Sequence, residues 1–522
     1  DGPETSELRF NWNAGIALDP FDPNGVFYGS QFLHYSSDRG ESWRRISPDL
    51  TTNNPAWQRQ AESGGLTIDV TGAENYETIM TIAPSTLTQG LVWVGTDDGR
   101  VQVTSDGGAS WASHEEKVYG VPRNSWVPHI EASKHFSGRA FVLFDDHRRN
   151  DQGTYVFRTD DLGASWSSLA SANLRGWAWC LEEDPVDPNL LFLGTELGLW
   201  VSFDAGAHWV QWTHGLPTVS VSALAVHPCE HDLVIATHGR ALYVVDDIRA
   251  LRGLTPEVLA EPLHLFDIAP AQEHVVAQAL GPRFAGSDEF RGENRPYGAL
   301  IDYSIGTLEP EPAVPDEGAD EEPRTAEKVR LRISSLEGAL LRELEVEPRL
   351  GLQRASWDLR KKGFRRPGVD AMEELGFGGG PAVIPGRYRV TVQYAGSEAS
   401  GEFEVLADPR QAIPLAARAE KLAALEEVGA LQERLARAIE RIDRLEVDID
   451  SILAKADEAK ADDAPRDAPH PHAELVELAR KTKRALAAEE KKLWYPADTK
   501  GIPKDDKVQS WIDDANSSLR SS

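Results

Sequence analysis

Acidic side chains gather at a set of predicted turns in the first half of this 522-residue chain, where they could act on a sugar. Glycoside hydrolysis uses two carboxyl groups that lie roughly 5 to 10 Å apart on either side of the scissile bond. The carboxyl groups placed to do so belong to Asp97, Asp98, Asp145, Asp146 and Glu196. No flanking pattern selects two of them, so the sequence does not decide whether the protein is an enzyme.

The same turns carry residue types that suit binding without catalysis. Trp offers a flat apolar face, and Arg, Glu and His offer charge-assisted hydrogen bonds. The candidate ligand-binding residues are Arg59, Trp126, Trp177, Glu196, His238 and Arg240. Charges at turns are usually just solvated, and Trp126 and Trp177 could equally start inner strands and pack against a neighbouring sheet.

Other chemistry finds little support in the sequence. His227, Cys229 and His231 are three possible metal ligands, but their spacing matches no common zinc motif, and a His-Pro turn explains them equally well. We therefore expect no metal site, and we expect no cofactor because no nucleophile elbow, P-loop or dinucleotide fingerprint is present. Cys180 and Cys229 lie in neighbouring units, so a disulfide between them can form but nothing in the pattern requires it.

One short phrase recurs four times and organises these turns, at residues 36–43, 104–111, 159–166 and 202–209. Each copy lies between two β-rich runs, so it should be a hairpin turn. Its Asp can accept hydrogen bonds within the turn, its Gly supplies a positive φ, and its Trp starts the next strand. We therefore predict structural roles for the aspartates and burial of the tryptophans: Asp38, Asp106, Asp161 and Asp204, with Trp43, Trp111, Trp166 and Trp209.

The spacing of the phrase predicts a β-propeller, because a repeat of about 40 to 50 residues with four strands is a propeller blade. A fifth unit begins near His227 and has lost the phrase. We therefore expect a mainly β chain whose residues 1–250 form five blade-like units that can belong to a larger propeller. In such blades the candidate site residues lie on the face opposite the phrase turns, and two long insertions, after Trp43 and after Phe144, emerge on that face.

The recurring phrase resembles the Asp-box, or BNR repeat, of β-propellers. Together with four longer runs, at residues 46–54, 95–100, 194–198 and 236–248, it looks like a bacterial family of exported BNR-repeat proteins. That family is similar to the propellers of sortilin-type vacuolar sorting receptors and is often labelled glycosyl hydrolase. The resemblance implies the propeller fold and export to the periplasm, the cell surface or the medium. Its members are typically longer at the amino end, so we expect this chain to be a fragment or a processed product.

These observations favour an exported binding or scaffold protein that recognises a glycan, a peptide or a protein partner on the face opposite the Asp-boxes. The alternative is a glycoside hydrolase that uses two of the carboxylates. The net charge of −30 argues against nucleic acid or an anionic membrane surface as the main partner, since both need a basic footprint. No run of about 18 apolar residues could span a membrane, and 15 Trp against two Met fits an extracellular β array.

The second half of the chain changes character three times. Residues 251–296 break the strand pattern and are interpreted as a connector. Residues 297–407 resume the strand pattern, which predicts a β-sandwich. Their runs at 355–359 and 384–390 resemble the immunoglobulin-like module related to the flagellar hook-capping protein. An acidic, Pro-rich insert at 308–327 should be mobile. Residues 408–522 have an apolar period of about 3.5, which predicts a helical hairpin whose stripe meets its own other half or another chain.

Overall fold

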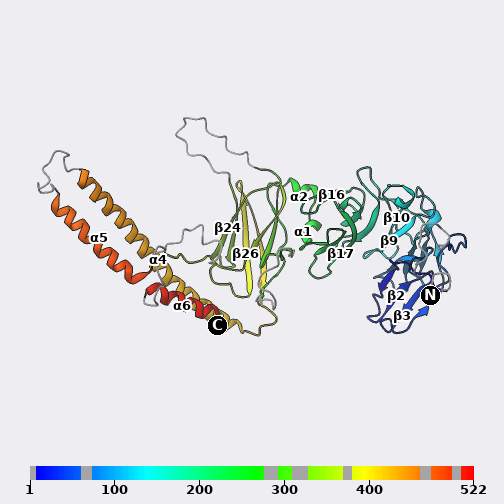
Figure 1. Cartoon of the computed structure of the whole chain (residues 1–522), viewed down its shortest axis with the longest axis horizontal. Coiled ribbons are helices and arrows are strands. Elements are labelled where there is room, and N and C mark those ends of the chain that lie inside the picture. The colour runs from blue at the N-terminus through cyan, green and yellow to red at the C-terminus, as the bar shows by residue number, and fades with distance from the viewer. Residues whose placement is uncertain are drawn as a thin grey trace, which may run out of the picture. The chain divides into compact units, whose positions relative to one another are not determined.

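Figure 1 shows the computed structural model of the chain, which describes residues 7–59, 73–274, 292–308, 327–367, 379–458, 472–495 and 507–521. Strands predominate, so the prediction of a mainly β chain is confirmed. The chain divides into two units, Asp1–Thr255 and Pro256–Ser522. The finer division into four segments stays a prediction, and apart from Leu308 and Glu327 the predicted mobile insert lies outside the described residues.

The first unit contains five antiparallel sheets in chain order. The first is β1 (Ile16–Leu18), β2 (Val26–Gly29), β3 (Leu33–Ser36) and β4 (Arg44–Arg45), and the second is β5 (Ile79–Pro84), β6 (Val92–Thr96), β7 (Val101–Thr104) and β8 (Ala112–Ser113). The third is β9 (Trp126–Ala132), β10 (Ala140–Asp145), β11 (Tyr155–Thr159) and β12 (Ser167–Ser168). The fourth is β13 (Ala178–Glu183), β14 (Leu191–Thr195), β15 (Gly198–Ser202) and β16 (Val210–Trp212), and the fifth is β17 (Ser220–Val226), β18 (Leu233–His238) and β19 (Leu242–Val245).

The sheets pack in sequence through their innermost strands, β1 on β5, β5 on β9, β9 on β13 and β13 on β17. A separate apolar core fills each of the four junctions between consecutive sheets. Successive antiparallel meanders packed face to face in this way have the architecture of β-propeller blades. The number of blades in a complete propeller stays a prediction.

The four turns of the recurring phrase, called Asp-box turns below because of that resemblance, join the third and fourth strands of the first four sheets, and they share one set of hydrogen bonds. Asp38 accepts the Ser42 N–H at 2.9 Å, the Ser42 hydroxyl at 2.6 Å and the Ser36 hydroxyl at 2.6 Å. These bonds favour the charged carboxylate and lower the pKa of Asp38 to about 2. Asp106, Asp161 and Asp204 repeat the pattern, with Ser110, Ser165 and His208 as the donors four residues on.

The four Asp-box tryptophans are buried to different degrees. Trp111, Trp166 and Trp209 pack into the cores that their own sheets form with the preceding sheets, and Trp209 is only 2% exposed. Trp43 is 43% exposed, so the expectation that all four are buried is wrong for it. The reason is its position: Trp43 belongs to the first sheet, and within the described residues no earlier sheet covers it.

The second unit pairs a three-stranded and a five-stranded sheet around one apolar core. The smaller sheet is β20 (His264–Leu265), β22 (Ala299–Ile305) and β25 (Gly351–Trp357). The larger is, in spatial order, β21 (Ala271–Gln272), β27 (Ser397–Leu406), β26 (Gly386–Tyr394), β23 (Val329–Ser335) and β24 (Leu340–Val346). Trp357 and Tyr303 from the smaller sheet and Phe403 from the larger are central to the core. The immunoglobulin-like assignment itself stays a prediction.

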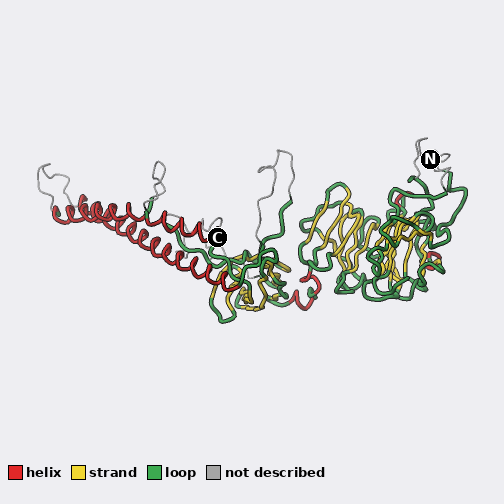
Figure 2. The backbone as a smooth tube through the Cα atoms, turned by 90° about the horizontal axis from the view of Figure 1, so that it is seen from below, coloured by secondary structure: helices red, strands yellow, loops and turns green. Residues whose placement is uncertain are grey.

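In the described part of residues 408–522, three helices follow the sheets of the second unit: α4 (Leu415–Glu458), α5 (Ala473–Leu493) and α6 (Val508–Ser521). Figures 1 and 2 show α4 and α5 side by side. Leu435, Ile439 and Ile442 of α4 form an apolar core with Trp494 and with Ile512 of α6, a helix that the sequence reading missed. Two short helices, α1 (Arg249–Arg252) and α2 (Pro256–Ala260), precede the sheets. No described helix is both long and apolar enough to cross a membrane.

Candidate functional site

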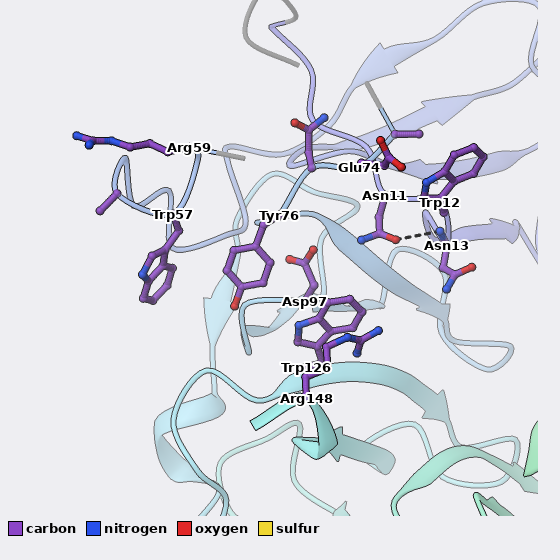
Figure 3. Close-up of a pocket in the computed structure, with 13 residues that line it drawn as sticks. Asn11, Trp12, Asn13, Trp57, Arg59, Glu74, Tyr76, Asp97, Trp126 and Arg148 are labelled. Atoms are coloured by element: carbon purple, nitrogen blue, oxygen red, sulfur yellow. Dashed lines mark hydrogen bonds between the residues drawn. The ribbon is translucent and has the colours of Figure 1, made fainter. Parts of the chain in front are cut away.

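Figure 3 shows the residues that line a cavity of about 720 Å³. The strand order places this cavity at the end of the sheets opposite the Asp-box turns. Its main lining side chains are Trp12, Trp57, Arg59, Tyr76, Asp97, Trp126 and Arg148. They come from segments that enter an innermost strand or join the second and third strands of a sheet. In an antiparallel meander these two kinds of connection share one end, and therefore residues far apart in the sequence meet there.

The described first part of the long insertion after β4, residues 46–59, is fixed in place and supplies one wall of this cavity. Glu77 is fully buried, has a φ of 63°, and accepts hydrogen bonds from the Thr52 hydroxyl at 2.6 Å and from the Asn54 N–H at 2.5 Å. Asp98 accepts the Thr52 N–H at 2.6 Å, and Arg9 pairs with Asp49 at 2.9 Å. Because these bonds tie the insertion to the second sheet, Trp57 and Arg59 are presented from a positioned loop.

Asp97 and Asp98 are both buried and hydrogen-bonded by neighbouring side chains or backbone. Asp97 accepts the Thr78 N–H at 2.7 Å and the Thr78 hydroxyl at 2.8 Å, and Asp98 also accepts the Thr96 hydroxyl. Burial outweighs these bonds for Asp97 and raises its pKa to about 7. A carboxyl group at the wall of a cavity that can hold a proton near neutral pH has the property of a general acid.

The other three candidate catalytic carboxylates also have protein partners. Asp145 accepts the His147 Nδ1–H at 2.7 Å, Asp146 accepts the Arg149 Nε–H at 2.7 Å, and Glu196 accepts the Trp179 indole N–H at 3.1 Å. These bonds hold the turn after β10 and the turn after β14 in place. The hydrogen bonds of Asp98, Asp145 and Asp146 stabilise the turns that contain them. None of these three residues lines the first cavity or the second cavity described below.

Aromatic and cationic side chains stack beside these carboxylates. The Arg148 guanidinium lies 3.5 Å from the centroid of the Trp126 ring, and its Nη1 is 3.7 Å from the Asp145 carboxylate. The His147 ring stacks on the Trp177 ring with centroids 4.4 Å apart and planes at 13°. Trp126 and Trp177 are half-buried. Trp126 presents its ring to the cavity, whereas Trp177 supports His147.

A second cavity of about 600 Å³ adjoins the first, and Asn13, Trp126 and Arg148 line both. The second cavity is also lined by Met80, Trp179, Glu196, Ser220, Ser222 and His238. Of the residues predicted from the sequence, the structure thus brings together Arg59, Asp97, Trp126, Glu196 and His238, while Trp177 and Arg240 line neither cavity.

Sequence reasoning missed Trp12, Trp57, Tyr76 and Trp179. Trp57 lies in the long insertion after Trp43, and because long loops often carry function, its position was an available signal. Trp12, Tyr76 and Trp179 lie just before or within innermost strands, where an aromatic residue usually signals packing. Cys180 is buried, Cys229 is exposed, and both are free thiols. No group of three or more His, Cys, Asp or Glu side chains able to hold a metal ion occurs among the described residues.

No family model and no curated protein matches the chain. Among solved structures it is similar to an ancestral GH74 enzyme, at 17% identity and a TM-score of 0.33, over 45% of this chain and 29% of that one. It is similar to YCF48 bound to D1 peptide, at 16% identity and a TM-score of 0.30, over 46% and 64%. It is similar to the GH74 xyloglucanase from Xanthomonas campestris, at 17% identity and a TM-score of 0.34, over 74% and 63%. The chain thus spans less than two thirds of each structure, and function has to be argued from the site itself.

Proposed function

We propose that the first unit is a binding module that holds an extended ligand across the two adjoining cavities, and that this ligand is a glycan. The observation that carries the proposal is the stacked pair of Arg148 and Trp126, which lines both cavities. A ligand long enough to occupy both cavities would cross this pair.

The composition of the walls favours a glycan over a peptide or a protein surface. Trp12, Trp57, Tyr76 and Trp126 offer flat faces on which the C–H face of a sugar ring can stack. Asn11 and Asn13 add amide groups that both donate and accept hydrogen bonds, as vicinal hydroxyl groups require. Apolar walls with a few placed polar groups are typical of small-molecule and oligosaccharide sites.

Glycoside hydrolysis is the second candidate, and the raised pKa of Asp97 favours it. Protonated Asp97 would donate to the leaving oxygen, and a second carboxyl group would act as base or nucleophile. Glu74 lines the same cavity and is the candidate for this second carboxyl group (Figure 3). Binding remains the better supported reading, because Asp97 already bonds Thr78 through both of its oxygens.

We propose further that the protein is an exported, sortilin-like BNR-repeat protein, with an immunoglobulin-like second domain and helices that contact a partner or another copy. The shared bonding of the four Asp-box turns supports the first part of this assignment. The sandwich core and the exposed Leu431, Leu445 and Ile452 of α4 support the second. Fractionation of cells that produce the protein from its complete native gene would test export.

The test of the proposed function is a glycan array probed with the purified chain, followed by incubation of each bound glycan with the chain and analysis of reducing ends. Binding without release of new reducing ends supports the binding module. Release that Asp97→Asn and Glu74→Gln each abolish supports the hydrolase. Absence of binding to every glycan, together with binding to a peptide library, would contradict the glycan assignment.

A further inference from the structure

Glu77 is a fully buried acid that lines neither cavity, and its backbone conformation is unusual. Its φ of 63° lies in the left-handed region that favours glycine. Glu77 stands between Tyr76, which lines the first cavity, and Thr78, whose N–H and hydroxyl both bond Asp97. A residue other than glycine keeps such a backbone only where its surroundings hold it there, and residues of this kind cluster at functional sites.

The hydrogen bonds to the Glu77 carboxylate come from one loop, residues 52–58. The Thr52 hydroxyl at 2.6 Å and the Asn54 N–H at 2.5 Å donate to one oxygen, and the Gln58 side-chain amide at 2.5 Å donates to the other. Among the described residues, no Lys or Arg forms an ion pair with this carboxylate. Because a buried carboxylate without donors is costly, Glu77 and the loop hold each other in place.

This loop carries Trp57, which belongs to the wall of the first cavity. Asn54 and Gln58 stand on either side of Trp57 in the sequence, and both bond Glu77. The Trp57 N–H also bonds the Asn54 carbonyl at 2.9 Å, and the Trp57 ring lies 6.0 Å from the Tyr76 ring (Figure 3). Glu77 therefore sets the position of two aromatic wall residues, Tyr76 through the chain and Trp57 through the loop.

We propose that Glu77 is a positioning residue of the ligand site, which holds the loop of residues 52–58 in its binding conformation before any ligand arrives. This inference rests on the proposed function, because it treats Trp57 and Tyr76 as the wall that a glycan contacts. When a loop is ordered during folding, the entropy cost of ordering it no longer weakens the binding of the ligand. Glu77 thus acts on affinity without contacting the ligand.

The experiment uses variants of the full chain that weaken the contact from either side. Glu77→Gln keeps the side-chain shape but replaces one acceptor oxygen by an amide group that cannot accept a bond from the loop. Glu77→Gly removes the carboxylate, and glycine adopts the φ of 63° without strain. Thr52→Val removes one donor at a half-buried position of the loop. Glu41→Gln is the matched control, because Glu41 is exposed in the first Asp-box turn.

The first measurement is amide hydrogen exchange of the ligand-free proteins, after circular dichroism has shown that each variant is folded. Exchange at residues 52–58 should be at least about tenfold faster in Glu77→Gln and in Glu77→Gly than in the wild type. The Asn54 N–H should change most, because it bonds the carboxylate directly. Thr52→Val should show a smaller increase in the same segment, and Glu41→Gln should show none.

The second measurement is calorimetric titration with the linear hexasaccharides of the glycan array, represented by cellohexaose, mannohexaose and chitohexaose. The hexasaccharide that the wild type binds best should bind both Glu77 variants at least about tenfold more weakly. Saturation with it should restore the slow exchange of residues 52–58 in these variants, because binding then has to order the loop. A residue with a structural role alone would lower the melting temperature without making loop protection depend on the sugar.

The outcomes separate this inference from the proposed function. Wild-type affinity in a Glu77→Gln variant whose loop exchanges rapidly would overturn the inference and leave the glycan assignment intact. Wild-type affinity in Glu77→Gly would assign the effect to the backbone and overturn the role of the carboxylate. Failure of the wild type to bind any of the three hexasaccharides would contradict the glycan site and the inference with it.

Thr52→Val keeps the proposal testable if both Glu77 variants fail to fold, since it leaves the buried residue unchanged. Faster loop exchange together with weaker hexasaccharide binding in this variant would support the positioning role. Wild-type exchange and wild-type affinity in Thr52→Val would overturn it.

Discussion

The Arg148 guanidinium carbon lies 3.5 Å from the centroid of the Trp126 ring, and Nη1 of Arg148 lies 3.7 Å from the Asp145 carboxylate. Arg148 follows β10 and Trp126 begins β9, so one antiparallel pair of strands brings the two residues together. The pair lines both of the adjoining cavities. It therefore gives the proposed ligand site a positioned cation and an aromatic platform at its centre.

Replacing Trp209 by Ala should lower the free energy of unfolding by about 3 to 5 kcal/mol, because a large aromatic side chain leaves a cavity in a packed core. The same replacement at Trp43 should cost far less, because its ring is already 43% exposed. Denaturant unfolding of both variants measures the difference. Equal losses at the two sites would mean that the Trp43 environment is as closely packed as that of Trp209.

The pKa of Asp97 predicts a pH dependence of stability. Burial raises the folded-state pKa of Asp97 to about 7, above its unfolded value, so the protonated form is favoured in the fold. The contribution of this group is fully present below the unfolded pKa and is lost as pH rises through about 7.

Melting curves from about pH 4 to about pH 8 should therefore show Asp97→Asn losing less stability than the wild type, by a few degrees in melting temperature. The Asn side chain retains a carbonyl oxygen to accept the Thr78 N–H. Parallel pH profiles for the two proteins would mean that Asp97 stays ionised in the fold.

Gly429 of α4 is expected to tolerate no side chain. A Cβ atom at this position would lie 2.0 Å from Cε2 of Phe364, which belongs to the segment between β25 and β26. Gly429→Ala should therefore lower the melting temperature of the second unit, and Phe364→Ala in the same chain should recover part of the loss. The neighbouring bond from the Arg365 N–H to Glu433, at 2.7 Å, provides an independent check by hydrogen exchange. A Gly429→Ala variant as stable as the wild type would show that this segment moves away without cost.

Features that depend on residues close together in the sequence could be predicted from it. Features that depend on the packing of one sheet against another could not. The Asp-box turns are determined by residues four positions apart, such as Asp38 and Ser42, so the short recurring phrase was sufficient to predict them. The exposure of Trp43 depends on which sheet stands next to it, and no local pattern contains that information. The first cavity joins Trp12, Tyr76 and Arg148 from three sheets, and their meeting requires the packing of β1, β5 and β9.

The five candidate carboxylates show the same division. Their positions at turns could be predicted from the sequence, because Asp and Glu beside Gly mark strand ends. Their hydrogen bonds to Thr78, Thr52, His147, Arg149 and Trp179 were not, since several of these partners lie on another strand or in another loop. Helix α6 was missed because its 14 residues follow a break in the pattern and lack a long apolar stripe.

The most direct test of the ligand site is isothermal titration calorimetry with an oligosaccharide selected on the array, comparing the wild type with Trp126→Ala, Arg148→Met and Leu87→Ala. Leu87 is exposed in the turn after β5, at the end of the second sheet opposite the cavities, and serves as the control. The account predicts at least about a tenfold weaker affinity for Trp126→Ala and for Arg148→Met, corresponding to the loss of one stacking or charge-assisted contact, and wild-type affinity for Leu87→Ala. Unchanged affinity in both site variants, with melting temperatures equal to that of the wild type, would contradict the claim that the ligand crosses the Trp126 and Arg148 pair.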